Sequence, residues 1–263
     1  MEERRKPQEG LFREILIGAY APREPQVMDV VLRFLEYEKK IPLALAHKIL
    51  DRLASMTVIT TVVTHAEIVD FIKGIPEDFG IVCGPCACRL NTAEKLGPDG
   101  RDLRGRKLDL HRQTPLNVDI QIAKCAEKFG KLKSYSPISK AELLALEDEC
   151  FDLGLVANVY VIMGGDAGIC HCSSATCAPF LANEALGGAS TVIKKGAFIP
   201  RTDGGACNGT GDCLKVCHFH ARKMVEREGK AISTMDPSEC YGCGLCAAVC
   251  PRKAISMVPR KGS

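Results

Sequence analysis

Apolar residues recur at three- and four-residue spacings in three early stretches of the chain, residues 24–40, 42–56 and 65–74. This spacing is typical of amphipathic helices. Residues 57–64 are short and β-branched, and their pattern is compatible with either a strand or a buried turn of helix. Residues 1–78 also contain no cysteine. We therefore interpret them as a helical N-terminal region, which a winged-helix-like domain would also fit.

The middle of the chain, residues 79–198, mixes helical and irregular patterns. Ser139 is suited to be a helix N-cap, Glu142 completes a capping box, and Gly154 is suited to end that helix. A shorter helix is predicted at residues 177–188. These signals predict a second, α/β region that is distinct from the first.

The end of the chain, residues 199–263, contains a predicted β-hairpin at residues 224–235, with its turn at Glu228 and Gly229. The expected fold class is therefore α+β, with a helical N-terminal region, a cysteine-rich α/β middle region and a separate C-terminal region. The charged, glycine-rich residues 97–107 are typical of a surface loop.

Cysteine is the residue type that changes the picture, because the chain contains 15 of them. The charged start of the sequence shows no apolar signal segment, and no run reaches the roughly 18 apolar residues that a membrane helix needs. We therefore expect a cytoplasmic location, where clustered cysteines bind metal or carry out redox chemistry rather than form disulfides. The net charge of +3 is too small to indicate nucleic-acid binding.

Seven of the cysteines lie in a repeat with a period of 33 residues near the end of the chain. The second copy is C-x2-C-x2-C-x3-C-P, formed by Cys240, Cys243, Cys246 and Cys250. The first copy has Cys207, Cys213 and Cys217 at the matching places. It has Thr210 opposite Cys243, and His218 opposite Pro251.

The second copy carries the bacterial ferredoxin signature, so this region resembles bacterial two-cluster ferredoxin domains. In such domains the last cysteine of each copy binds the cluster of the other copy. The resemblance implies a ferredoxin-like dicluster region with one [4Fe-4S] cluster held by Cys240, Cys243, Cys246 and Cys217. It implies a second cluster held by Cys207, Cys213 and Cys250, with Thr210 in the fourth place.

Thr210 raises the question of which cluster the second site holds. A threonine hydroxyl is hardly ionised near neutral pH, so it is a poor substitute for a thiolate. Three thiolates can hold a [3Fe-4S] cluster, or a [4Fe-4S] cluster whose fourth iron takes water or an external ligand. The alternative is that this half has lost its cluster and survives as scaffold. Asp212 is a weaker candidate ligand, because it lies two residues past Thr210.

The middle region offers a further metal site. Its candidate ligands are Cys86, Cys88, Cys125, Cys170, Cys172 and Cys177. Short C-x-C pairs that lie far apart along the chain suit a site assembled from two loops, and thiolates favour iron–sulfur clusters or zinc. Cys83 is a weaker candidate, and Cys150 is expected to be a buried apolar residue of a helix.

This middle pattern resembles a larger group of predicted iron–sulfur proteins from anaerobic prokaryotes. That group combines a C-x-C-R segment, an isolated cysteine, a helix ending in Gly-Leu-Val and an I-C-x-C segment before a ferredoxin pair. The matching pieces begin here at Cys86, Cys125, Gly154 and Ile169. The chain departs from the group at residues 173–176, where further cysteines are common.

We interpret the chain as an electron-transfer protein that relays single electrons between redox partner proteins, and no residue is assigned a catalytic role. One alternative is an oxidoreductase subunit that binds substrate at an open iron beside Thr210. The other is a redox-sensing regulator whose N-terminal helices contact DNA. Residues 44–56 offer only Lys48 and Arg52 as basic side chains, so nucleic-acid binding is not expected.

Overall fold

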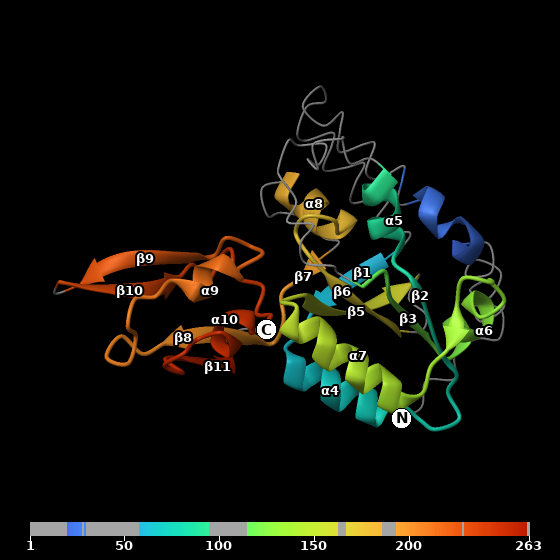
Figure 1. Ribbon diagram of the computed structural model, residues 1–263, viewed down its shortest axis with the longest axis horizontal. Coiled ribbons are helices and arrows are strands. Elements are labelled where there is room, and N and C mark those ends of the chain that lie inside the picture. Colours follow the sequence, from blue (N-terminus) through green and yellow to red (C-terminus); the bar gives the residue numbers. More distant parts are fainter. Residues whose placement is uncertain are drawn as a thin grey trace.

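The computed structural model describes residues 20–27, 29, 58–94, 115–162, 167–185, 193–227 and 229–261. It consists of a sheet covered by helices and an arm of short strands and helices that projects from one side (Figure 1). The predicted loop at 97–107, the predicted helix at 42–56 and most of the helix at 24–40 lie outside the described residues. The mixture of helices and strands confirms the predicted α+β class.

The described part of the chain contains one seven-stranded sheet, in the order β4-β2-β3-β6-β5-β1-β7. The strands are β1 (Val58–Val62), β2 (Ile81–Pro85), β3 (Asn117–Ile122), β4 (Ser136–Pro137), β5 (Val156–Ile162), β6 (Ala167–Cys172) and β7 (Ile193–Lys194). Neighbours are antiparallel except β1 and β7, which are parallel. The strands β2 and β6 lie on either side of β3 and lead into the cysteine segments described below, so the sheet fixes the position of those segments.

Helices cover both faces of the sheet. Figure 1 shows α4 (His65–Gly74) and α7 (Lys140–Asp152) side by side on one face. On that face, apolar side chains of both helices pack against β3 and β6 in one buried cluster. The predicted capping box of Ser139 and Glu142 is confirmed at the start of α7. The other elements of this part are η1 (Ala21–Arg23), α5 (Ala87–Glu94), α6 (Lys124–Phe129) and α8 (Ala178–Ala185).

Within residues 57–64, whose pattern left strand and helix open, Val58–Val62 form strand β1. β1 pairs antiparallel with β5 and parallel with β7. The following helix, α4, packs against α7. The described residues of the predicted N-terminal region therefore share one sheet and one core with the middle region, across the boundary expected at residue 78.

The projecting arm repeats one small unit twice. β8 (Phe198–Thr202) pairs with β11 (Ile255–Pro259), and β9 (Arg222–Arg227) pairs with β10 (Lys230–Met235). Two short helices, α9 (Asp212–Lys215) and α10 (Leu245–Ala248), follow the cysteine loops of the two copies. The hairpin predicted at 224–235 is confirmed, and Gly229 in its turn has a φ of 70°.

Each cysteine loop of the arm uses two glycines in the left-handed region, Gly209 and Gly211 in the first copy and Gly242 and Gly244 in the second. A side chain at Gly242 would also run into the backbone oxygen of Phe198. Only glycine tolerates both a left-handed backbone and so close an approach of another backbone, which explains why the glycines of the two copies align. The sequence repeat is thus also a structural repeat.

Replacing Gly168 by alanine tests the packing of the sheet beside its most polar buried residues. A Cβ at Gly168 would run into the ring of Tyr160, which is 4% exposed and cannot move aside into solvent. We expect Gly168→Ala to lower the free energy of unfolding by about 1–3 kcal/mol. Gly80→Ala is the matched control, because its Cβ would meet only Ala126 Cβ at 3.8 Å. Urea unfolding followed by circular dichroism measures both, and equal stabilities would contradict the packing described.

Candidate metal and redox sites

A cavity of about 570 Å³ lies where the ends of β2 and β6 meet the starts of α5 and α8. Its wall contains five of the predicted ligands, Cys86, Cys88, Cys170, Cys172 and Cys177. We call it the central cavity. The remaining candidate, Cys125, does not line it. Cys125 is fully buried in α6, in a core cluster with Phe129 and Tyr135, against which Cys170 also packs.

The two C-x-C segments reach the central cavity for local reasons. β2 ends at Pro85, and the Cys86 N–H donates to Leu116 O (2.9 Å) before α5 begins. Cys170 and Cys172 are two residues apart on β6, so their side chains share one face of the strand. Cys177 closes the next turn by donating its N–H to Ser173 O (3.0 Å). The segment of Cys86 and Cys88 is far in sequence from the segment of Cys170, Cys172 and Cys177, and the two meet only in the folded sheet.

The five thiols form one hydrogen-bonded group. Cys170 Sγ and Cys172 Sγ are 3.3 Å apart. Hydrogen bonds from Cys177 and Cys86 hold the pKa of Cys88 well below its usual value. Hydrogen bonds from Cys170 and Cys177 do the same for the pKa of Cys172. Thiolates are the form of cysteine that binds metal, so the cavity favours this form at two positions.

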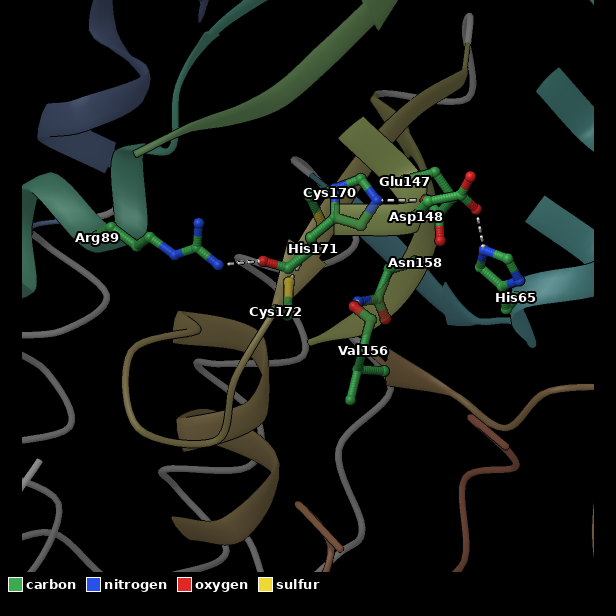
Figure 2. A network of polar contacts seen from close by, with 9 residues as sticks. All are labelled: His65, Arg89, Glu147, Asp148, Val156, Asn158, Cys170, His171 and Cys172. Atoms are coloured by element: carbon green, nitrogen blue, oxygen red, sulfur yellow. Dashed lines mark hydrogen bonds and ion pairs between the residues drawn. The ribbon is translucent and has the colours of Figure 1, made fainter. Parts of the chain in front are cut away.

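Arg89, the arginine of the C-x-C-R segment, ties the two cysteine segments together. Its guanidinium donates to the carbonyl oxygen of His171 (2.6 Å) and also to Pro115 O. Figure 2 shows the His171 carbonyl directed toward Arg89 and the His171 ring directed toward Glu147. The residue between the two β6 cysteines is therefore held from both sides of the strand.

The His171 ring forms a buried ion pair with Glu147 of α7. Burial, the largest influence, lowers the pKa of His171. Hydrogen bonds with Cys150 and Glu147 outweigh it and raise that pKa to about 10. The imidazole is thus charged and engaged by α7, which leaves Cys170 and Cys172 as the candidate ligands of this segment. Cys150 is fully buried beside Val118 and Leu155, as expected for an apolar helix residue.

The opposite wall of the central cavity carries two buried acids, Asp119 and Glu24, which sequence reasoning missed. Asp119 accepts hydrogen bonds from Tyr160 Oη (2.5 Å), from Gln121 Nε2 (2.8 Å) and from Tyr135 Oη. Burial raises the pKa of Asp119 to about 6 against these bonds, and burial also raises the pKa of Glu24. The one sequence signal was an acidic residue in the middle of the apolar strand β3.

The arm contains two further cavities, and they divide its cysteines between them. One is lined by Cys217, Cys240, Cys243 and Cys246. The other is lined by Cys207, Cys213 and Cys250, with Thr210 beside them. We call them the four-cysteine cavity and the Thr210 cavity. The two groups contain the same residues as the two ligand sets expected from the sequence, including the exchange of Cys217 and Cys250 between the copies.

Residues 206–254 match the family model of the 4Fe-4S dicluster domain. The C-terminal region is such a domain, as its cysteine spacing predicted. This domain and the abundance of cysteines support an iron–sulfur electron-transfer role. No curated protein matched the chain. Among the helices that the structure describes, none is long and apolar enough to span a membrane.

In the dicluster domain, hydrogen-bond donors point at the sulfur atoms of the cysteines. Arg222 Nη2 lies 3.4 Å from Cys246 Sγ, and the Ala254 N–H donates to Cys250 Sγ (3.3 Å). The Leu245 N–H donates to Cys243, whose pKa burial nevertheless raises to about 12. A cationic iron core would overcome this cost of burial and hold the thiolates ionised, so the residues fit the cluster that the family binds.

The described residues contain no group of three or more His, Cys, Asp or Glu side chains gathered closely enough to hold a single metal ion.

Asp119→Asn tests the acidic wall through its pH dependence. Because the folded state raises the pKa of Asp119 from 3.8 to about 6, it favours the protonated acid. The protonated Asp119 therefore contributes fully to the free energy of unfolding below about pH 4. This contribution, at most about 3 kcal/mol, is lost as the pH rises through about 6. Urea unfolding of reduced, metal-free protein should show this decline in the parent chain and a flatter profile in Asp119→Asn. Asp78→Asn, at an exposed acid, should keep the parent profile. Parallel profiles for Asp119→Asn and the parent chain would contradict the assignment.

Proposed function

We propose that the protein relays single electrons between redox partners through the two cysteine-lined cavities of its dicluster domain and holds a further metal in its central cavity. The observation that carries the proposal is the division of the domain's cysteines into two buried groups. Bound iron–sulfur clusters supply one-electron chemistry. The chain's own contribution is to bury the sulfur ligands and aim hydrogen bonds at them, which are the main protein influences on cluster potential.

The four-cysteine cavity provides a complete thiolate set and suits a [4Fe-4S] cluster. The Thr210 cavity provides three thiolates and suits a [3Fe-4S] cluster, or a [4Fe-4S] cluster with one open iron. Asp212 is a poor fourth ligand, because its carboxylate already accepts a hydrogen bond from Lys215 Nζ (2.8 Å) and another from Thr210.

The central cavity suits a third iron–sulfur cluster, because thiolates bind such clusters. Zinc is the alternative, but it would require the thiols to draw closer around one ion than they do in this structure. The five cysteines of the cavity exceed the four ligands that either metal site needs. Cys88 and Cys172 are the best ligand candidates, since hydrogen bonds lower the pKa of both thiols.

An oxidoreductase subunit is the second candidate function. The observation that favours it is the acidic wall, because Asp119 and Glu24 lie in the same cavity as the five cysteines and a simple electron carrier has no need of buried acids. In this variant of the proposal the central cavity receives both electrons and protons, and a small substrate is reduced there.

Thr210→Cys tests the cluster in the Thr210 cavity. Supplying the missing thiolate should complete the ligand set and add about one iron per chain if the parent site holds three irons. Iron and sulfide analysis with electron paramagnetic resonance, on protein purified without oxygen, should show loss of a three-iron signal. A parent site with an open fourth iron should keep its iron content and change its spectrum.

Thr234→Cys is the control for that experiment, since it adds a thiol on β10 outside the residues that line the cavity. The proposal for the Thr210 cavity fails if Thr210→Cys leaves both the iron content and the spectrum unchanged.

Cys88→Ser tests the metal site of the central cavity. Removing one favoured thiolate should lower the content of the third metal, while the spectrum of the dicluster domain stays as in the parent chain. Cys83→Ser is the matched control, because Cys83 Sγ donates to Asn117 O (3.4 Å) and a serine can keep that bond outside the cavity. Because four cysteines remain in Cys88→Ser, a double variant, Cys88→Ser with Cys172→Ser, leaves only three of the five and completes the test. Metal analysis of these proteins decides the point, and equal metal content in the double variant and in Cys83→Ser would rule the site out.

A further inference from the structure

The four-cysteine cavity and the central cavity share one wall. A single buried cluster contains Cys172 and Cys177 from the central cavity together with Tyr241 and Leu245 from the dicluster domain, and Cys243 packs against it. Aromatic rings fill the space between the two sets of cysteines. Phe219 stacks on Tyr241 with ring centroids 4.4 Å apart, and Phe180 lies 5.1 Å from Phe219. The two cavities are therefore separated by packed side chains rather than by solvent.

His218 makes a direct polar link across the same wall. Its Nδ1 accepts a hydrogen bond from the Ser174 N–H (3.2 Å), so its Nε2 carries the proton and donates to Gly154 O (2.8 Å). His218 follows Cys217 of the four-cysteine cavity, and Ser174 lies in the turn between Cys172 and Cys177. One hydrogen bond thus joins the side chain of the residue after a ligand of one cavity to the backbone between two cysteines of the other.

The position of His218 in the repeat makes this link specific to one half of the domain. The second copy has Pro251 at the matching place, and a proline can neither accept nor donate these bonds. His218, where the sequence departs from the ferredoxin pattern, is therefore also one of the residues that join the two parts of the molecule.

Further bonds fix the dicluster domain against the sheet. Tyr241 Oη donates to Asn183 Oδ1 of α8 (2.9 Å), and the Gly196 N–H donates to Tyr241 O (2.9 Å). Arg260 donates to Gly196 O, in the connection between the sheet and the dicluster domain, and to Cys240 O within that domain, both at 3.0 Å. Electron transfer between buried sites falls steeply with distance, so a domain held in this way keeps the rate high.

The Thr210 cavity lies on the other side of the four-cysteine cavity. A small core of Cys213, Cys246 and Ile255 separates these two cavities, and it contains no residue of the sheet. The cluster that joins the dicluster domain to the sheet includes Leu245 of α10, and it includes none of the residues that line the Thr210 cavity. The three sites therefore follow one another in the order Thr210 cavity, four-cysteine cavity, central cavity.

We propose that the central cavity is the internal redox partner of the dicluster domain, and that His218 is the residue that positions the two for electron transfer. Electrons enter at the Thr210 cavity, which is nearest the end of the arm, and pass through the four-cysteine cavity to the central cavity. In the last step the four-cysteine site loses one electron and the metal of the central cavity gains it, and no bond forms or breaks. The inference rests on the third metal of the proposed function.

The first test measures magnetic coupling. In reduced protein, electron paramagnetic resonance should show the signal of the four-cysteine cluster broadened by a paramagnetic metal in the central cavity. The double variant Cys88→Ser with Cys172→Ser, which leaves only three cysteines in the central cavity, should remove the broadening and keep the cluster signal. Two outcomes would overturn the inference and leave the dicluster relay intact. In one, the parent chain holds its third metal but the cluster signal is not broadened; in the other, the third metal is zinc. Absence of a third metal from the parent chain would overturn both the inference and the proposed third site.

The second test measures the rate of internal electron transfer by rapid freezing after reduction. His218→Ala should slow the arrival of electrons at the central metal severalfold, because loss of the bonds to Ser174 and Gly154 loosens the fixed spacing of the two sites. Metal content and the cluster signals should stay unchanged. His218→Gln, whose amide can both accept and donate, should restore much of the rate. His220→Asn, at an exposed histidine two residues on, serves as the control. An unchanged rate in His218→Ala would refute the positioning role.

Discussion

The hydrogen bond from Arg89 to the carbonyl oxygen of His171 is the interaction on which the central cavity depends. It connects the segment after β2 with the segment in β6, which are more than eighty residues apart, and it uses a buried cation to do so. Such a cation is stable in a protein interior only when its donors are satisfied. Its two acceptors are the carbonyl oxygen of His171, which lies between two cysteines of β6, and that of Pro115. Losing the bond to His171 would leave buried guanidinium donors unsatisfied and the two ligand segments unconnected.

The ion pair of His171 and Glu147 extends this constraint to α7. One residue of β6 is thereby held through its backbone by α5 and through its side chain by α7. The cysteines on either side of it gain a fixed spacing, which the hydrogen bond between Cys170 and Cys172 reinforces. This is the geometry expected of a preorganised ligand set, in which the scaffold rather than the metal bears the cost of ordering.

Local signals in the sequence were sufficient for several elements. The capping box at Ser139 and the turn at Gly229 each depend on residues that are neighbours along the chain, and the structure contains both. The dicluster domain could be predicted for the same reason, since its cysteine spacing is a local property.

The pairing of β1 with β5 could not be predicted, because a short β-branched run does not indicate its partner. Nor could the separation of Cys125 from the central cavity, which follows from how α6 packs. The burial of Asp119 depends on Tyr135 and Tyr160, which come from other parts of the chain.

The short connection between β7 and β8 has a consequence for how this molecule is put together. Only residues 195–197 separate the last strand of the sheet from the first strand of the dicluster domain. Gly196 within it packs closely against the backbone of Val62 and Tyr241. A cut at this point would separate Tyr241 and Leu245 from the apolar side chains of the sheet and of α8 that bury them, and it would expose both residues to water. The dicluster domain is therefore not a separable module. Either half produced alone would expose an apolar surface that the other half covers in the intact molecule.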